Sequence, residues 1–379
     1  MDKLNLSAAL SHCLWQIESK LQEEIVGIER VTKVYGTNSN SFILTSLNPQ
    51  KEESRYFLKF NDAEFMDLET QKATEIAQFL PTPKVIMNAP VDGQPGIKWG
   101  LFQHLAGKLI TEKFIQQDYE EDSSDLIIIE RQKENLLQEM YNAGSKSITL
   151  EEYRNCRANN LFEKRLFGPR FNEFFSGGSD NVSQYFDYSI YLNGKKISSS
   201  ISSIFDGLRN KYLHLSQKEI ITRMSHGDAH HGNIIIDDNN RIWFIDNEYA
   251  GQLPAYLELS KPYYNDFIGE LFYHYHSTLS GYFDVKSVET SAKKLNVEIQ
   301  LKRPLGPRLD VTKIKIESRS SQLKDNHDPI SLNDYLIMCH TLTKNPNNYP
   351  DDVKWLFLVF IPIINQFDAL KPESIYDFF

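Results

Sequence analysis

The pattern of apolar and polar positions predicts an N-terminal third built of helix, three strands, helix and two strands. Apolar residues recur near the 3.6-residue period of a helix in two stretches, and β-rich runs separated by polar turns lie between them. The expected elements are a helix over 4–25, a strand before Gly36, strands over 42–46 and 55–60, a helix over 62–80 that stops at two prolines, and strands over 85–87 and 98–105.

The remainder of the chain predicts a larger and mostly helical region. Residues 107–220 are largely helical and polar in pattern, and their acidic stretch "DYEEDSSD" is expected to be a solvated loop or a helix start. The alternating stretch 295–318 predicts a β-hairpin around Pro304 to Pro307. The apolar run at 355–364 is about half the roughly 20 residues of a membrane-spanning helix, so a buried C-terminal helix is expected.

Composition narrows the class of protein. The 379 residues include 41% hydrophobic and 12% aromatic residues, which favours two packed lobes, and a net charge of −10 argues against a nucleic-acid binder. Three distant cysteines, Cys13, Cys156 and Cys339, form no CxxC pair, and the N-terminus carries polar residues through its apolar part. A cytoplasmic protein without a disulfide framework is therefore expected.

The segment "SHGDAHHGNIIIDDNNRIWFIDNEYAG", residues 225–251, concentrates the candidate chemistry. Asn233 precedes one hydrophobic run, Asp246 ends a second, and the turn "DDNN" separates the runs. A hairpin would place Asn233 and Asp246 side by side, and such oxygen ligands suit Mg²⁺, which is commonly held by one or two side chains together with substrate phosphates. Asp228 would then lie close enough to take a proton from a hydroxyl that attacks a metal-bound phosphate.

This segment resembles the aminoglycoside phosphotransferase and choline kinase family of small-molecule kinases. The family signature HGDxHxGN matches "HGDAHHGN" at 226–233 at every fixed position. "FIDNEYAG" at 244–251 is similar to the metal-binding segment of the family, with Asn247 where an aromatic or small apolar residue is more usual. The histidine-glycine-aspartate form and the absence of an APE motif resemble the small-molecule branch rather than the protein kinases.

A lysine and a glutamate upstream extend the resemblance. Kinase-like folds need a lysine on the third strand to reach the nucleotide phosphates and a carboxylate on the next helix to hold that lysine. Lys59 ends the third predicted strand, and Glu69 lies on the following helix. Glu75, one to two turns further on, is the alternative partner.

The resemblance also implies where the rest of a nucleotide would bind. The loop "YGTNSNS" has one glycine where protein kinases show GxGxxG, so backbone amides with Ser39 or Ser41 are expected to cap the phosphates. The segment "LFQHLAG" would be the hinge, with backbone groups of Gln103, His104 and Leu105 hydrogen-bonding the adenine.

The histidines of the region have two possible roles. Loop-ordering hydrogen bonds are expected for His226 and His230, whereas the adjacent pair His230 and His231 also suggests a zinc site, for which no HExxH motif or cysteine partner is present. His274 and His276, among aromatic residues, are expected in the core or in a pocket wall.

Several carboxylates and tyrosines are further candidates. Asp266 resembles the later aspartate of the family, which supports the active-site loop, and Glu248 either touches the metal or holds that loop. A cationic acceptor would be held by charge and cation–π contacts, with a structural role as the alternative. The candidates for this contact are Glu258, Glu270, Tyr263 and Tyr264.

Together these features predict an α+β, two-lobed protein-kinase-like fold. Residues 1–104 would form the nucleotide-binding lobe, with an antiparallel sheet and a helix, and 105–379 the mostly helical catalytic and acceptor-binding lobe. The resemblance implies an ATP- and Mg²⁺-dependent transfer of phosphate to a hydroxyl of an amino sugar, an amino alcohol or a specialised metabolite such as an antibiotic. The net charge and the short apolar runs argue against nucleic acid and membrane as partners. The alternatives are a catalytically silent nucleotide-binding module and a protein kinase, and the short spacing from Asp246 to Asp266 argues against the latter.

Overall fold

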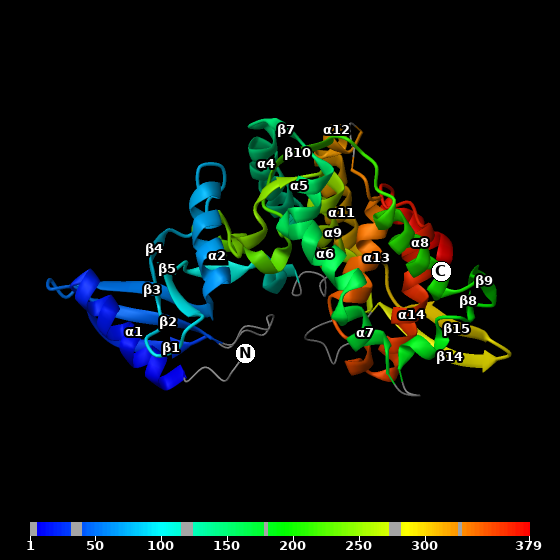
Figure 1. The fold of residues 1–379 in the computed structure, drawn as a ribbon, viewed down its shortest axis with the longest axis horizontal. Coiled ribbons are helices and arrows are strands. Elements are labelled where there is room, and N and C mark those ends of the chain that lie inside the picture. The colour runs from blue at the N-terminus through cyan, green and yellow to red at the C-terminus, as the bar shows by residue number, and fades with distance from the viewer. Residues whose placement is uncertain (1–5, 32–39, 115–123, 178–180, 273–281, 325–327) are drawn as a thin grey trace. The chain divides into compact units, whose positions relative to one another are not determined.

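The computed structural model describes residues 6–31, 40–114, 124–177, 181–272, 282–324 and 328–379, and the chain divides into two compact units (Figure 1). Unit 1 comprises Met1–Ile110 and Gly232–Ala250, and unit 2 comprises Thr111–His231 and Gly251–Phe379. The units are therefore interleaved along the chain. The expected division into a nucleotide-binding lobe, 1–104, and a catalytic and acceptor-binding lobe, 105–379, stays a prediction.

The main sheet of unit 1 is antiparallel, with the strand order β1-β2-β3-β5-β4. Its elements are α1 Leu6–Leu21, β1 Glu24–Arg30, β2 Ser41–Leu47, β3 Glu53–Asp62, α2 Ala63–Ile76, β4 Val85–Pro90 and β5 Ile97–Gln103. Helix α1 buries Ala9, Cys13 and Ile17 against alternating strand residues such as Leu44 and Leu58. The period-2 pattern of these strands thus gives the sheet one face that packs on α1.

Helix α2 packs on the opposite face, and Gly100 permits its close approach. A Cβ atom at Gly100 would lie 2.5 Å from the Sδ atom of Met66 on α2. Gly100 is paired across the sheet with Lys59 of β3. Because paired residues of neighbouring strands point to the same face, the Lys59 side chain lies on the face that α2 covers.

The first strand differs from the expectation. The predicted boundary between the first helix, expected over 4–25, and the first strand was wrong. Helix α1 ends at Leu21, and β1 already begins at Glu24. Gln22 has a φ of 58°, a left-handed conformation that ends the helix. Residues 32–39, which include the rest of that run, lie outside the described residues.

A second sheet of unit 1 contains the predicted hairpin, which is confirmed. Strands β11 Ile234–Asp237 and β12 Ile242–Phe244 pair antiparallel, and β6 Gly107–Leu109 pairs with β11. The Asp237 carboxylate accepts hydrogen bonds from the backbone N–H groups of Asn239 and Arg241, which fixes the "DDNN" turn. A Cβ at Gly107 would lie 2.3 Å from the Ile236 carbonyl oxygen, so only glycine fits there.

Unit 2 is mostly helical and contains two small sheets, β13-β10-β7 and β14-β15-β8-β9. Its elements are α4 Ser124–Asn142, β7 Ser145–Ile148, α5 Leu150–Asn155, α6 Arg157–Phe167, α7 Pro169–Phe175, β8 Ser189–Leu192, β9 Lys195–Ser198, α8 Ile201–Leu213, β10 Ile220–Ser225, β13 Gly251–Leu253, α9 Ala255–Tyr263, α10 Gly269–Phe272, β14 Phe283–Ser291, β15 Lys294–Leu301, α11 Gly306–Ser318, α12 Ser320–Lys324, α13 Leu332–Leu342 and α14 Asp351–Gln366. Helix α14 buries its run from Leu356 to Ile364, which confirms the predicted buried C-terminal helix. Within the described ranges, no helix combines the length and apolar character needed to cross a membrane.

The prediction of a hairpin around Pro304 to Pro307 was wrong. The hairpin lies earlier, where β14 and β15 are joined by Ala292 and Lys293, both with positive φ as a two-residue type I′ turn requires. Residues 306–318 form helix α11 instead. Apolar and polar residues alternate in this sequence, as they would in a strand. The helix accommodates this pattern because several of its polar residues, including Arg308 and Lys315, are buried as well.

Candidate active site

Lys59, Glu69 and Asp246 form an ion cluster within unit 1. The Lys59 Nζ atom lies 2.9 Å from the Glu69 carboxylate and 3.0 Å from Asp246 Oδ1. Lys59 and Glu69 are each only 6% exposed, whereas the Asp246 side chain is 28% exposed. The cluster forms because β3 presents Lys59 to α2, which carries Glu69, and the segment that follows β12 contributes Asp246.

The charges of this cluster favour an ionised lysine. Burial would lower the pKa of Lys59, but Asp246, Glu69 and Glu248 together raise it above its ordinary value. The other candidate partner, Glu75, instead pairs with Lys72 at 2.7 Å on the more exposed side of α2. The expected contact of Lys59 is therefore made by Glu69. One cation beside two carboxylates leaves the cluster with a net negative charge.

The β11–β12 hairpin brings Asn233 next to the segment of Asp246. Ile234 pairs with Phe244, and the Ile245 N–H donates to the Asn233 carbonyl oxygen at 3.0 Å. Asp246 has a φ of 56° and a ψ of 57°, so the chain turns sharply after β12. An amide oxygen and a carboxylate in a negatively charged, partly open setting fit a hard divalent cation that also needs phosphate and water ligands.

Asp228 lies in the turn that precedes the hairpin and belongs to unit 2. Gly227 has a φ of 79°, which suits glycine, and the Asp228 N–H donates to His226 Nδ1 at 3.3 Å. Lys261 of α9 places its Nζ atom 3.2 Å from Asp228 Oδ2, and both side chains are mostly buried. His230 Nε2 lies 3.8 Å from Asp228 Oδ1. The loop therefore holds Asp228 between cationic or hydrogen-bonding groups.

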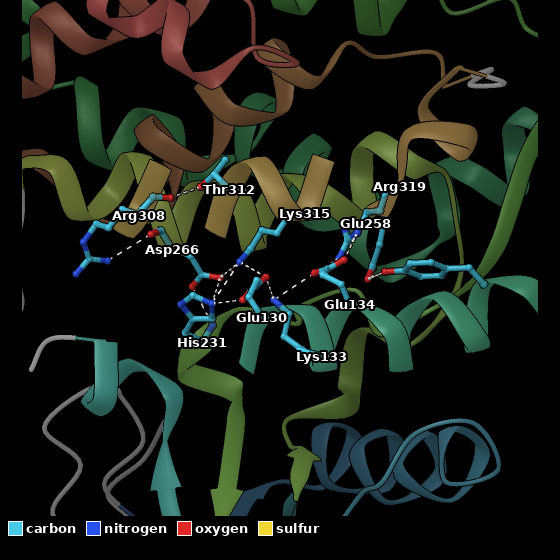
Figure 2. Close-up of polar contacts among 11 residues, drawn as sticks. Glu130, Lys133, Glu134, His231, Glu258, Asp266, Arg308, Thr312, Lys315 and Arg319 are labelled. Carbon is cyan, nitrogen blue, oxygen red and sulfur yellow. Dashed lines mark hydrogen bonds and ion pairs between the residues drawn. The ribbon is translucent and has the colours of Figure 1, made fainter. Parts of the chain in front are cut away.

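His231 is a structural residue of the same loop. Its backbone N–H donates to Asp266 Oδ1 at 2.8 Å, and its ring Nε2 lies 2.7 Å from Glu130 Oε2, which assigns the ring proton to Nε2 (Figure 2). Burial lowers the pKa of His231 to about 4, so the ring is neutral at pH 7. Asp266 thus supports the loop as expected. Over the described ranges, no group of three or more His, Cys, Asp or Glu side chains is placed to bind a metal ion.

Next to this loop a continuous row of buried charges joins α4 to α11 (Figure 2). Lys315 lies 2.6 Å from Glu130 and 3.2 Å from Asp266, and Arg319 donates twice to Glu134, at 2.9 and 3.1 Å. We refer to this set as the α4–α11 row; its members are Glu130, Lys133, Glu134, His231, Asp266, Lys315 and Arg319. Three carboxylates balance three cations, and each charged member is at most 3% exposed.

Glu258 connects the end of the row to the Asp228 turn. Its carboxylate accepts from the Tyr141 hydroxyl at 2.9 Å and from the Gly227 N–H at 2.6 Å. Burial raises the pKa of Glu258 to about 7, against the opposing influence of Arg319. The backbone of the HGD turn is therefore tied to a buried carboxyl group of α9.

Sequence reasoning missed three groups that support the Asp228 loop. They are Lys261 on α9, Glu130 on α4 and Lys315 on α11, all outside the motif. Glu258 was named from the sequence, but its contact with the Gly227 N–H was not predicted. A signal was present on α4, where Glu130, Lys133 and Glu134 share one helix face by their i, i+3 and i+4 spacing. The sequence alone does not tell that this face is buried.

The residues expected at the adenine and the phosphates are only partly described. Ser39, His274 and His276 lie outside the described residues. Ser41 is 1% exposed at the start of β2, directly opposite Lys59. The Gln103 N–H donates to the Lys84 carbonyl oxygen within the sheet, and His104 and Leu105 follow the strand without regular secondary structure.

Three of the four candidates for a cationic acceptor are buried, and the side chain of the fourth, Glu270, is 12% exposed. Glu258 is bonded to Tyr141 and Gly227, and Glu270 lies 3.3 Å from Arg308. The two tyrosines are also buried; they are Tyr263 at 0% and Tyr264 at 8% exposure. These contacts favour the structural role that the sequence left open.

Comparison with solved structures shows the fold. Aminoglycoside phosphotransferase APH(4)-Ia, in a ternary complex of a thermostable mutant with ADP and hygromycin B, matches 94% of this chain and 99% of its own with a TM-score of 0.53 and 11% identity. A second complex of that protein, with AMP-PNP and hygromycin B, matches 93% of this chain and 98% of its own with a TM-score of 0.51 and 13% identity. No protein-family model matches the sequence, and no curated protein matches it.

The α+β, protein-kinase-like fold expected from the sequence is therefore confirmed, and it is the fold of the aminoglycoside phosphotransferases. The similarity spans nearly the whole chain, so it includes the α4–α11 region as well as the N-terminal sheet. At this level of identity the similarity concerns the fold, and the activity must be argued from the site itself.

Proposed function

We propose that this protein is an ATP-dependent phosphotransferase that transfers the γ-phosphate to a hydroxyl group of a small molecule. The observation that carries the proposal is the buried Lys59 ammonium held by Glu69 and Asp246. A fully buried ammonium is costly unless it is paired, and a cluster with excess negative charge and one partly exposed carboxylate is suited to a cation and a phosphate. The HGD turn with Asp228 supplies the remaining group that the reaction needs.

Each site residue has a proposed role. Lys59, oriented by Glu69, contacts the nucleotide phosphates, while Ser41 lies at the start of the strand that follows the phosphate-capping loop, in which Ser39 is the other candidate. The adenine would bind backbone groups of Gln103, His104 and Leu105. Asn233 and Asp246 would hold Mg²⁺, which supplies charge neutralisation of the phosphates when it is bound.

Asp228 is the proposed base. The acceptor hydroxyl oxygen forms the new bond to the γ-phosphorus, the bond to the β,γ-bridging oxygen breaks, and Asp228 takes the hydroxyl proton. Phosphoryl transfer has a loose transition state, so orientation of the acceptor and charge stabilisation account for most of the acceleration. Lys261 contacts the Asp228 carboxylate, while His226 and Glu258 accept from the backbone N–H groups of Asp228 and Gly227. These contacts support the role because they fix the loop and the orientation of its carboxylate.

The proposed acceptors are amino sugars, amino alcohols and hydroxylated specialised metabolites or antibiotics. Support comes from the APH(4)-Ia structures, which contain hygromycin B beside ADP or AMP-PNP. The three separate cysteines, which form no CxxC pair, are the basis for proposing an enzyme of a reducing compartment such as the cytoplasm.

The test is calorimetric titration of ATP, with and without Mg²⁺, into the wild-type chain and into Asp246→Ala. We expect Mg²⁺-dependent binding in the wild type and its loss in the variant. A screen for ADP release with amino sugars, amino alcohols and hydroxylated natural products would then identify the acceptor.

Glu75→Gln is the matched control because it removes a carboxylate from the same helix without touching Lys59. If the wild type binds no ATP in either condition, the proposal is wrong. Tight binding of ATP without phosphate transfer to any acceptor would favour the nucleotide-binding module, and transfer to peptides alone would favour a protein kinase.

A further inference from the structure

Unit 2 contains a pocket of about 290 Å³ beside the end of the α4–α11 row. It lies among α4, β7, β10, β13, α9 and the junction of α11 with α12. Its lining residues are Tyr141, Ser145, Ile221, Arg223, Ser225, Leu253, Ala255, Glu258, Arg319 and Gln322. Every one of them belongs to unit 2, whereas Lys59, Asn233 and Asp246 of the proposed nucleotide and metal site belong to unit 1, so binding here does not require the function proposed above.

Arg319 gives the pocket a hydrogen-bond donor that lacks an acceptor. The Nε and Nη2 atoms donate to the two carboxylate oxygens of Glu134, at 2.9 and 3.1 Å. The Nη1 atom has no hydrogen-bond partner among the described residues, although Arg319 is only 1% exposed. A buried charged donor without an acceptor is costly, and an oxygen ligand would remove that cost.

Arg223 adds a positive charge to the same pocket. This half-buried side chain donates to the Tyr141 carbonyl oxygen at 3.4 Å, and no carboxylate of the described chain lies within ion-pair distance of it. Because Glu134 already neutralises Arg319, the charge of Arg223 is the one that a ligand would balance. Arg223 and Arg319 both line the pocket, and a pair of guanidinium groups at one site favours a planar anion with two oxygens.

Glu258 is the acidic group of the pocket, and its charge depends on pH. The groups that face it are Tyr141 and Glu134 from α4, Arg319 from the end of α11, and the Gly227 N–H from the HGD turn. Burial raises its pKa to about 7, so its neutral form is well populated near neutral pH. In that state the pocket carries a net positive charge.

We propose that this pocket binds a small carboxylate, whose carboxyl group pairs with Arg223 and Arg319. Leu253, Ala255 and Ile221 supply an apolar wall for a short hydrocarbon body. The volume lies near the lower end of the range of ligand sites, which limits the ligand to about the size of a single ring. Through Glu258, which holds the Gly227 N–H, the pocket is in contact with the turn that carries Asp228.

Benzoate is the probe, and benzyl alcohol is its matched neutral analogue. Benzoate has the required size, and a carboxyl group with an ordinary pKa of about 4 stays ionised between pH 6 and 8. We expect saturable calorimetric binding of benzoate to the full chain and at least tenfold weaker binding of benzyl alcohol. Failure of benzoate to bind, or equal binding of the alcohol, would overturn the proposal.

Two variants locate the binding. Arg223→Gln removes the unbalanced charge without breaking an ion pair, and Ala255→Met fills the pocket; each should weaken benzoate binding at least tenfold. Arg131→Gln, an exposed arginine on α4, should leave the binding unchanged. Circular dichroism confirms that each variant is folded, and benzoate binding that survives both pocket variants would show that the site lies elsewhere.

The pH dependence supplies a readout that a purely structural pocket would not give. Ionised Glu258 repels a carboxylate, so benzoate should bind several-fold more weakly at pH 8 than at pH 6. Glu258→Gln keeps an acceptor for the Gly227 N–H and should abolish that difference. A pH dependence that persists unchanged in Glu258→Gln would contradict the assigned place of the ligand.

Discussion

Two buried ion clusters of this protein differ in their net charge and in their exposure to solvent. Around Lys59 in unit 1, one cation meets two carboxylates, and the Asp246 side chain is still 28% exposed. In unit 2, the α4–α11 row sets three cations against three carboxylates that are almost fully buried. An unbalanced and partly open cluster is suited to an added ligand, whereas a balanced and closed one chiefly fixes its surroundings. This difference supports the nucleotide and metal binding proposed for the first cluster and a loop-positioning role for the second, in which Arg319, at the end of the row, also lines the pocket described above.

The largest expected effect comes from replacing Asp228, which lies in the loop that the α4–α11 row and Glu258 support. Asp228→Ala should lower turnover by about 10²- to 10⁴-fold, because a positioned base contributes that much to proton transfer. The affinity for ATP should stay within several-fold, since the proposed nucleotide contacts belong to unit 1. Steady-state kinetics and calorimetry measure the two quantities, and a large loss of ATP binding would break the division of roles.

The second prediction tests closure of the row. Lys315→Met should reduce the free energy of unfolding by about 3–5 kcal/mol, because Glu130 and Asp266 would be left as buried carboxylates without their shared cation. Lys313→Met, on the same helix but at a surface pair, should cost no more than about 1 kcal/mol. Urea titration of both variants measures the difference. Equal stabilities would show that Lys315 is not needed to neutralise the buried carboxylates of the row.

The third prediction concerns pH. Glu258 has its pKa raised to about 7 from an ordinary 4.5, so its favourable contribution to stability is complete below about pH 4.5 and is lost as the pH rises towards 7. Glu258→Gln should therefore gain stability relative to the wild type over this interval, by up to about 3 kcal/mol. Unfolding curves at pH 5, 6, 7 and 8 test this, and a constant difference between the two proteins would contradict the role of ionisation.

The smallest expected effect sharpens the description of the Lys59 cluster. Glu69→Gln should weaken Mg²⁺-ATP binding roughly tenfold to a hundredfold, the value of one hydrogen bond between charged groups. Glu75→Gln should bind ATP like the wild type, because Glu75 pairs with Lys72. Equal effects of the two substitutions would mean that Glu69 does not orient Lys59.

Much of unit 1 was predictable because its signals are local in sequence. Alternating strand residues, the prolines after α2, and the spacing of Asn233 and Asp246 each predict structure by themselves. Lys59 and Glu69 could be chosen because the resemblance implies a lysine on the third strand and a carboxylate on the next helix, and the predicted order of elements contains both. The boundary at Gln22 was missed because a left-handed residue other than glycine has no strong sequence signal.

Unit 2 was harder because its core contains charged residues. A pattern of apolar residues cannot reveal that Lys315 and Arg319 face inward, since their burial depends on carboxylates of α4 more than 180 residues earlier. The same cause turned α11 into a predicted strand, because its buried polar residues made the apolar ones seem to alternate. Lys261, the ion-pair partner of Asp228, is likewise recognisable only in three dimensions.

The interleaving of the two units has a consequence for how this chain is synthesised. Strand β6 cannot pair with β11, and Lys59 cannot pair with Asp246, before the segment 232–250 has been synthesised and has left the ribosome. A nascent chain of 110 residues thus contains the main sheet but lacks one of the two carboxylates around its buried ammonium. Such long-range closure slows folding and exposes the incomplete unit to aggregation and to chaperones. Truncation after Ile110 should accordingly yield an unstable fragment rather than an independent nucleotide-binding domain.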